Sequence, residues 1–287
     1  MPVKKVSKKS KTVGTAVEVD LSLPKEKSVP SSHIGDYTWL IYGEKKIGKS
    51  SLTAEFEQNF CMMFEPGGKA LTAYQRPVPV WEHARKYIDL LIKEGQGNFR
   101  SVSVDTGQLA YDRCLEYVSK INGIQHPGGQ NDYGLSWSKV KSEFEKQHTR
   151  LLSAGFGLIV IAHAKALKLE TRSGFTYDVL RPAISGQAAD YYTGVIDNIA
   201  FYHFEGGERF LQIRGDDYVT AGTRCQGHFL TTDGEPVCRI PMGNSAKEAY
   251  ENLIKAFENK QKDPFIPTYL TKKKTALKRT TKKVVKS

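Results

Sequence analysis

The sequence predicts an α/β fold in which a mostly parallel sheet is sandwiched between helices. Apolar strand-like segments alternate with helical or loop segments that are long enough for right-handed parallel crossovers. Residues 158–162 (LIVIA) are uniformly apolar, as expected of a central strand covered on both faces. A loop containing two glycines, residues 43–50, separates a predicted strand from a predicted helix. Since ligands of such sheets bind at the carboxyl ends of strands, the residues that end strands are the candidate site residues.

Apolar periodicity and turn residues predict the elements in chain order. The first half is expected to contain a strand over 38–43, a helix over 50–60, a strand over 61–65, a helix over 81–93, a strand over 99–106 and a helix over 109–121. A loop over 123–134 is followed by a helix over 136–154, the strand over 158–162, two strands over 196–204 and 209–214 joined by a hairpin turn at 205–208, and a last helix over 246–259. The predicted strand ends are Gly43, Glu65, Asp105 and His163.

The composition indicates one domain in a reducing compartment. The 287 residues are 39% apolar, which is enough for one large core. No run of about 18 apolar residues occurs and no signal peptide is evident, so we expect a cytoplasmic protein without membrane contact. The four cysteines are too scattered for a disulfide framework. Cys225, His228 and Cys238 could supply three zinc ligands, but irregular spacing and the lack of an evident fourth ligand favour ordinary structural residues.

The net charge of +11 is concentrated at the two ends of the chain. Residues 1–29 carry 7 Lys and 3 acids, a charge of +4, and residues 260–287 carry 10 Lys or Arg and 1 acid, a charge of +9. Residues 30–259 therefore sum to 11 − 13 = −2. We expect a folded domain over 30–259 between two disordered basic arms that attract nucleic-acid phosphates; the alternative is that the arms only increase solubility.

Residues 43–50 read Gly-Glu-Lys-Lys-Ile-Gly-Lys-Ser, the P-loop pattern Gly-x4-Gly-Lys-Ser. Its glycines allow backbone N–H groups to surround phosphate oxygens at the start of a helix. Lys49 would bridge the β- and γ-phosphates and the Ser50 hydroxyl would ligate Mg²⁺. The predicted cofactors are ATP and Mg²⁺, and the predicted nucleotide-contacting residues are Gly43, Glu44, Lys45, Lys46, Ile47, Gly48, Lys49, Ser50 and Ser51.

The three other strand ends supply candidates for hydrolysis. Asp105 ends an apolar strand, where P-loop enzymes place the acid of the Mg²⁺ site, although an acid there also serves as a helix N-cap. Glu65 ends the strand after the P-loop helix and is expected to lie beside the P-loop strand, where it could act as general base; the alternative is a surface Glu before a Pro-Gly turn. His163 ends the central strand and could sense the γ-phosphate, or it is a structural histidine.

The order of these motifs resembles that of phage-encoded RecA-like ATPases of the single-strand annealing and recombination type. The resemblance covers roughly residues 36–225. It includes the P-loop, the strand ends at Glu65 and Val-Asp105-Thr106, a loop at 132–137, LIVIA followed by His163, and Arg-Pro-Ala-Ile-Ser-Gly at 181–186.

This resemblance implies a RecA-like ATPase that hydrolyses ATP between neighbouring subunits of a homo-oligomeric ring or filament and binds single-stranded DNA. It implies that Glu65 is the catalytic glutamate, Asp105 the metal-site acid and His163 the switch residue. Residues 212–215 resemble a Lys-x-Arg element that reaches a neighbour's phosphates; because position 212 is Gln, only Arg214 could act, with Arg224 as the fallback. A plain surface salt-bridge role is an equal alternative for both arginines.

Residues 164–181 mix basic and aromatic side chains, the combination used for non-specific single-strand binding. The same pattern around residues 172–174 also suits an exposed hairpin. Three other functions stay open: a helicase or packaging motor, a nucleotide kinase, and a nucleotide-binding DNA scaffold without catalysis. The chain lacks the Asn-Lys-x-Asp element of a GTPase at a strand end, which disfavours that class.

Overall fold

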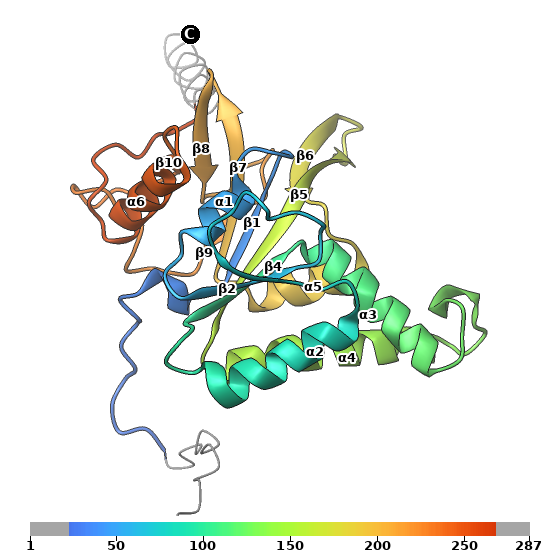
Figure 1. Cartoon of the computed structure of the whole chain (residues 1–287). Coiled ribbons are helices and arrows are strands. Elements are labelled where there is room, and N and C mark those ends of the chain that lie inside the picture. The colour runs from blue at the N-terminus through green and yellow to red at the C-terminus, as the bar shows by residue number, and fades with distance from the viewer. Residues whose placement is uncertain (1–22, 268–287) are drawn as a thin grey trace, which may run out of the picture.

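The computed structural model describes residues 23–267, which form a sheet covered by helices on both faces (Figure 1). Six neighbouring strands run parallel, in the order β7 (Asn198–Glu205), β1 (Trp39–Gly43), β5 (Gly157–Glu170), β4 (Ser101–Asp105), β2 (Asn59–Met63) and β3 (Tyr74–Pro77). Antiparallel strands extend it: β8 (Glu208–Gln212) and β10 (Arg239–Pro241) beyond β7, β9 (Gly222–Thr223) on β7, and β6 (Thr176–Pro182) on β5. The predicted α/β class with a mostly parallel sheet is confirmed.

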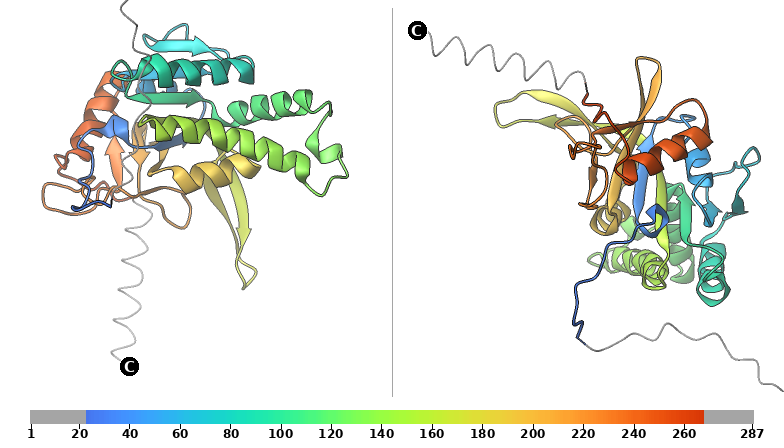
Figure 2. Two further views of the ribbon diagram at one scale, coloured as in Figure 1. Left: turned by 90° about the horizontal axis from the view of Figure 1, so that it is seen from below. Right: turned by 90° about the vertical axis from the view of Figure 1, so that its left-hand side faces the viewer.

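The helices form two layers, one on each face of the sheet (Figure 2). The larger layer contains α2 (Trp81–Leu90), α3 (Gly107–Ile121), α4 (Leu135–Ser153) and α5 (Gly186–Val195). The smaller layer contains α1 (Lys49–Ala54) and α6 (Ala246–Phe257). Short helical turns precede β1 (η1, Ile34–Asp36), follow α2 (η2, Leu91–Gly95) and interrupt the α3–α4 loop (η3, Pro127–Gly129).

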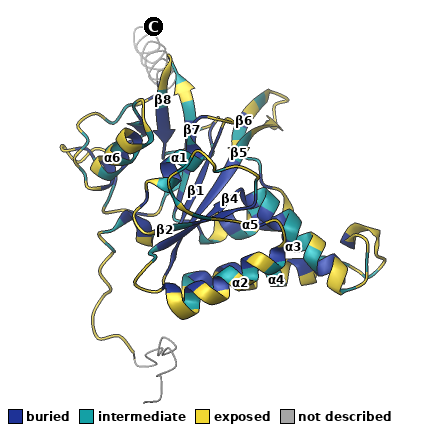
Figure 3. Ribbon diagram, in the orientation of Figure 1, coloured by how far each residue is buried: buried dark blue, intermediate teal, exposed yellow. Residues whose placement is uncertain are grey.

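Alternating side chains of β1 enter two separate hydrophobic cores. Trp39 and Ile41 pack with α1 and α6, whereas Leu40 and Tyr42 pack with the larger helix layer. All five residues of β1 are buried, and so are the first six residues of β5, which pairs with it (Figure 3). The prediction that 158–162 is a doubly covered strand is therefore confirmed. This central pair supports the loop that follows Gly43.

The helix predicted over 50–60 is wrong in length, because α1 ends at Ala54. Its apolar residues have helical spacing but lie on opposite faces of the sheet. Phe56 contacts Trp39 and Tyr250 in the smaller layer, whereas Phe60 lies in β2 and contacts Tyr87 of α2 in the larger layer. The chain crosses between the two faces through Gln58, which has a positive φ of 51°.

The strand predicted to end near residue 162 continues to Glu170 and turns back as β6. His163 is therefore inside β5, not at its end, which corrects that prediction. The resulting β5–β6 hairpin projects away from the body of the molecule (Figures 1 and 2). The hairpin predicted at 205–208 is confirmed, since Glu205 pairs with Glu208 around two glycines of positive φ. The elements β3, α5, β9 and β10 were not predicted.

The folded unit extends beyond residue 259, where the basic tail was predicted to begin. The backbone N–H of Cys238 donates to the Pro264 carbonyl at 2.8 Å, and the Arg239 Nε donates to the Phe265 carbonyl at 2.7 Å. Gln261 forms an isolated bridge with Thr231. Residues 1–22 and 268–287, which hold most of both predicted arms, lie outside the described residues.

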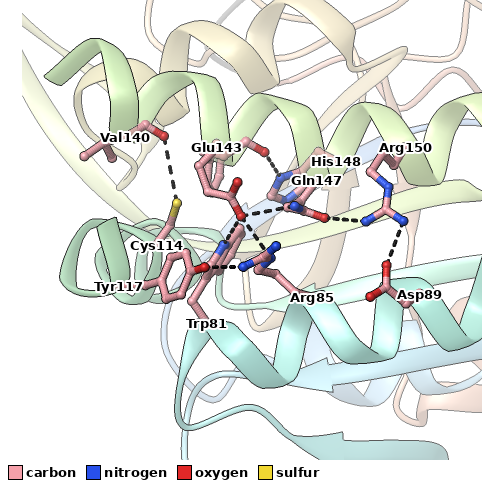
Figure 4. Close-up of polar contacts among 11 residues, drawn as sticks. Trp81, Arg85, Asp89, Cys114, Tyr117, Val140, Glu143, Gln147, His148 and Arg150 are labelled. Carbon is pink, nitrogen blue, oxygen red and sulfur yellow. Dashed lines mark hydrogen bonds and ion pairs between the residues drawn. The ribbon is translucent and has the colours of Figure 1, made fainter. Parts of the chain in front are cut away.

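Polar side chains join the helices of the larger layer (Figure 4). Glu143 on α4 accepts from the Trp81 indole of α2 at 3.0 Å and faces Arg85 at 3.4 Å. Further along, Arg150 donates to Gln147 and to Asp89. These contacts, which range from buried to exposed, join α2 to α4 along the length of both helices.

His148 of α4 is buried within this layer and is held in its neutral form. Its Nδ1–H donates to the Phe144 carbonyl at 2.9 Å, so Nε2 accepts from the Tyr192 hydroxyl at 3.0 Å. Burial lowers the pKa of His148 from its usual 6.5 to about 4.

We expect this histidine to make the fold sensitive to acid. Its contribution is complete above pH 6.5 and is lost as the pH falls toward 4, because only the unfolded chain binds the proton in that window. The loss amounts to roughly 3 kcal/mol, at 1.36 kcal/mol per pKa unit. Urea unfolding between pH 7.5 and 4.5 measures it. His148→Gln should flatten this dependence, whereas His126→Gln, a change on the α3–α4 loop, should leave it unaltered; an equal slope in His148→Gln contradicts the assignment.

Candidate nucleotide-binding site

The loop that connects β1 to α1 has the conformation of a phosphate cradle. Lys46 and Gly48 have positive φ values of 65° and 113°, which turn the backbone around the loop centre. A Cβ at Gly43 would stand 2.0 Å from the Tyr202 carbonyl oxygen of β7, so only glycine fits there. Lys49 is buried, and its ammonium donates to the carbonyls of Gly43 at 3.1 Å and Glu44 at 2.5 Å. Burial lowers the pKa of Lys49, and the nearby carboxylates of Asp105 and Glu65 oppose this.

A cavity of about 340 Å³ opens in front of this loop, at the carboxyl ends of the parallel strands. Three of the four predicted strand-end residues, Glu65, Asp105 and His163, line this cavity together with most of the P-loop; Gly43 does not. Its lining residues are Lys45, Lys46, Gly48, Lys49, Ser50, Ser51, Met63, Glu65, Pro66, Gly67, Gly68, Asp105, Ile161 and His163.

Ser50 and Asp105 meet at one wall of the cavity. The Ser50 Oγ donates to Asp105 Oδ2 at 2.5 Å, and the Asp105 side chain is buried. Burial raises the pKa of Asp105, the Ser50 hydrogen bond lowers it, and the Glu65 carboxylate raises it again. Hydroxyl and carboxylate oxygens are the kind of ligand that Mg²⁺ prefers. These two residues therefore fit the Mg²⁺ site of a P-loop protein.

Glu65 lines the cavity, but it does not lie beside the P-loop strand as predicted. Strands β5 and β4 separate β2 from β1, because β2 pairs with β4 and β3. Glu65 reaches the cavity because its backbone N–H donates to the Asp105 carbonyl at 2.9 Å, which holds the chain at the end of β2 over β4. Its carboxylate is half-exposed and faces the cavity mouth.

His163 lies opposite Gly43 in the register between β5 and β1. Its Nε2 is 3.7 Å from Glu65 Oε2, and its buried Nδ1 has no hydrogen-bond partner among the described residues. Burial and the charge of Lys49 lower the pKa of His163. The imidazole is therefore neutral at pH 7, and it lines the same cavity as Lys49 and Glu65.

Arg214 and Arg224 lie outside this cavity. The Arg214 Nε donates to the Val237 carbonyl at 3.1 Å, beyond the end of β8. Arg224 is exposed and donates to the Gly194 carbonyl at 3.0 Å, near the start of β7, whereas the P-loop follows the opposite, carboxyl ends of the parallel strands. Neither side chain contacts the P-loop of its own chain.

Sequence reasoning did not single out Arg209, which the structure places against the P-loop. Its Nη1 lies 3.6 Å from the position of a Cβ at Gly48. It was missed because it occupies the antiparallel strand β8, whose start returns to the carboxyl end of β7. The Gly67–Gly68 turn after Glu65 was also missed as a wall of the cavity, although its Pro-Gly-Gly sequence signals a turn.

The Cys225, His228 and Cys238 group was considered above as a set of zinc ligands. Cys225 donates to Asn198 and His228 stacks on Phe257, and no cluster of three potential metal ligands from His, Cys, Asp and Glu occurs within residues 23–267. None of the helices in that part of the chain is both long and apolar enough to cross a lipid bilayer.

The strand order, the Gly-x4-Gly-Lys-Ser loop and the Ser50–Asp105 contact define a P-loop nucleotide-binding protein. The family model AAA_24, described as an AAA domain, matches residues 36–225, and the chain belongs to this family. The predicted resemblance to phage-encoded P-loop ATPases is confirmed, since one relative is of prophage origin.

That relative is the SPbeta prophage-derived uncharacterized protein YorG of Bacillus subtilis (strain 168), which is 26% identical over 154 residues. The alignment covers 50% of this chain and 46% of YorG, so the chain spans less than half the length of that relative. One similar solved structure is the KaiC-like protein PH0186 of Pyrococcus horikoshii OT3, with 12% identity and a TM-score of 0.43; the match covers 75% of this chain and 88% of PH0186. Another is the RadB recombinase, with 15% identity and a TM-score of 0.36; the match covers 62% of this chain and 80% of RadB.

Proposed function

We propose that this protein is an Mg²⁺-dependent ATPase of the RecA-like type that binds single-stranded DNA during phage recombination, annealing or replication. The observation that supports hydrolysis most strongly is the convergence of Lys49, Ser50, Asp105, Glu65 and His163 on one cavity. The P-loop by itself is sufficient for phosphate binding. An additional acid and histidine in the same cavity, Glu65 and His163, are suited to chemistry on a terminal phosphate.

The roles follow from position. Lys49 neutralises charge on the β- and γ-phosphates, and Ser50 with Asp105 would hold Mg²⁺, which when bound offsets the negative charge of the phosphates. Glu65 accepts the proton of the attacking water, because its half-exposed carboxylate faces the cavity. His163 orients Glu65, whose Oε2 is 3.7 Å from the imidazole Nε2. His163 also lies opposite Gly43, the first residue of the P-loop, in the register between β5 and β1.

The β5–β6 hairpin is the proposed contact for single-stranded DNA. Cross-strand pairing puts Lys165 and Arg181 at its base and Leu169 and Tyr177 nearer its tip on the same face. Phe175 is 65% exposed and stacks on Tyr177 at 6.3 Å and 14°. An exposed Phe175 ring stacked on a half-buried Tyr177, on a hairpin that carries Lys165 and Arg181 at its base, suits base stacking combined with phosphate contact. His163 belongs to the same strand, so the hairpin begins one residue from the proposed site of hydrolysis.

We expect Phe175→Ala to weaken binding of a fluorescein-labelled oligothymidylate by about fivefold or more, since stacking contributes roughly 1–3 kcal/mol per base. Fluorescence anisotropy at fixed salt measures this affinity. Tyr74→Ala removes an aromatic ring that is 67% exposed on the edge strand β3 and serves as the matched control. Equal affinities of the two variants contradict the hairpin as the binding surface.

The proposed role of the basic C-terminal tail predicts a change in salt dependence. Truncation after residue 267 retains the segment that packs on β10. It removes 8 of the 10 Lys and Arg residues in 260–287 and keeps Lys260 and Lys262. DNA affinity should fall and the slope of log K against log[salt] should become shallower, because fewer phosphates are neutralised. Basal ATP turnover should be unchanged. If the slope of the truncated protein equals that of the full chain, the tail only increases solubility.

The proposal includes ATP-dependent assembly into a homo-oligomer, with Arg214 or Arg224 directed at the nucleotide of a neighbouring subunit. Both arginines lie away from the P-loop of their own chain, which is the arrangement that an arginine supplied in trans requires. Size-exclusion chromatography with and without a non-hydrolysable ATP analogue tests assembly. Mixing Lys49→Ala with Arg214→Gln protein then tests complementation. An interface at which the Arg214→Gln subunit supplies Lys49 and the Lys49→Ala subunit supplies Arg214 contains both residues, so turnover should recover in the mixture.

A further inference from the structure

Arg209 approaches the P-loop from the side opposite to Glu65 and Asp105. Strand β7 pairs with one edge of β1 and β5 with the other, so β8 reaches the loop from the β7 side. Arg209 opposes Phe204 at the carboxyl end of β7. Its guanidinium Nη1 lies 3.6 Å from the Cβ position of Gly48, next to the Tyr202 hydroxyl at 3.7 Å from the same point.

The guanidinium is held in place by groups that do not neutralise it. Its Nε donates to the Gly243 carbonyl at 3.0 Å, and its Nη1 lies beside the buried Tyr202 side chain. Arg209 forms no ion pair among the described residues: of the nearby acids, Glu205 pairs with Arg239 and Glu248 accepts from the Asn244 N–H at 2.8 Å. A half-buried cation beside a phosphate cradle therefore keeps its full charge.

Two backbone groups that hold Arg209, the Met242 N–H and the Gly243 carbonyl, come from the part of the chain beyond the family match at 36–225. The Met242 N–H donates to the Arg209 carbonyl at 2.8 Å. Gly243 has a positive φ of 60°. At the start of α6, the Glu248 N–H donates to the Ser245 Oγ at 3.1 Å and the Glu248 carboxylate accepts from the Asn244 N–H, and these contacts hold the turn. The segment from β10 to α6 thus holds the Arg209 side chain against the P-loop at Gly48.

We propose that Arg209 is a nucleotide-binding residue supplied in cis, whose guanidinium contacts the α- and β-phosphates of the nucleotide held by the P-loop. This inference rests on the proposed function. The backbone around Gly48 is the part of a P-loop that surrounds the α- and β-phosphates, whereas the γ-phosphate points toward the acids. A guanidinium forms strong charge-assisted hydrogen bonds with phosphate oxygens.

The test measures equilibrium binding of ADP and of a non-hydrolysable ATP analogue, both with Mg²⁺, to the full chain. Arg209→Gln should weaken both by a similar factor of about tenfold or more, because both contain the contacted phosphates. Arg209→Lys should recover part of the affinity, and the salt dependence of ADP binding should become shallower in Arg209→Gln only. Arg113→Gln, a change in the exposed Arg113–Glu116 pair of α3, is the matched control.

The possible results separate this inference from the proposed function. Absence of nucleotide binding by the wild-type chain would overturn both. Binding by the wild type with unchanged affinity in Arg209→Gln would overturn the inference alone, as would weakening of the ATP analogue without weakening of ADP. Weaker ADP binding with an unchanged salt dependence and a lower melting temperature of the nucleotide-free variant would show that Arg209 only supports the loop, and would also overturn it.

Discussion

Lys49→Ala is expected to lose nucleotide binding by at least about 100-fold, with turnover falling below detection. The reason is geometric: Lys49 is the P-loop cation that is buried against the carbonyls of Gly43 and Glu44, so no exposed lysine can replace its charge inside the cradle. Calorimetric titration with ATP and Mg²⁺ measures the binding, and phosphate release measures the turnover.

The appropriate control is Lys93→Ala, which removes an exposed lysine that pairs with Glu94 on η2, far from the cradle in the fold. It should bind ATP with wild-type affinity. Thermal melting of the nucleotide-free proteins establishes that Lys49→Ala is folded. Wild-type ATP affinity in folded Lys49→Ala would remove the P-loop from the account of this protein.

Glu65→Gln should separate binding from hydrolysis. The amide has the shape of the carboxylate but cannot accept a proton from water, and loss of a general base slows turnover by about 10²- to 10⁴-fold. ATP affinity should stay within a few-fold of wild type, because Glu65 lies across the cavity from the P-loop and faces His163. Single-turnover kinetics with saturating enzyme measure the chemical step directly.

Glu57→Gln is the matched control, since Glu57 is exposed beyond α1 and pairs with His33 outside the cavity. Turnover that is unchanged in Glu65→Gln would favour a nucleotide-binding scaffold over an ATPase. A large decrease in ATP affinity of the same variant would instead show that Glu65 serves the bound state rather than the reaction.

The P-loop could be predicted from the sequence because its geometry is local. Eight consecutive residues contain both the cradle and its lysine, and the strand before and the helix after it are each recognisable from their own residues. The acid at Asp105 followed in the same way from an apolar strand with a polar end. These assignments need no knowledge of which strands are neighbours.

The parts that were predicted incorrectly depend on strand order. Glu65 was expected beside the P-loop strand because β2 follows β1 in the chain, but β5 and β4 lie between them. His163 was expected at a strand end, because the apolar run stops at Ala162; exposed residues continue the strand, and cross-strand pairing with β6 rather than burial stabilises it. Arg209 reaches the P-loop only through the return of β8 along β7, which no local pattern indicates.

His163 connects the cavity to the base of the β5–β6 hairpin. Its imidazole faces Glu65, its carbonyl accepts from the Ala183 N–H at 2.7 Å, and Lys165 two residues later donates to the Ile184 carbonyl at 3.1 Å. The base of the hairpin is therefore joined by hydrogen bonds to the segment that precedes α5. If phosphate binding moves the imidazole, as the proposed function requires, these hydrogen bonds connect the movement to both strands of the hairpin.

The most direct test of a DNA-linked ATPase is the steady-state rate of phosphate release by the wild-type protein with Mg-ATP, measured across a titration with single-stranded DNA. We expect a basal rate that Glu65→Gln lacks and that rises to a plateau as DNA saturates the protein. A rate that stays constant throughout the titration, at salt concentrations at which the DNA is bound, would contradict coupling between the site and the hairpin. A rate indistinguishable from that of Lys49→Ala would contradict hydrolysis itself.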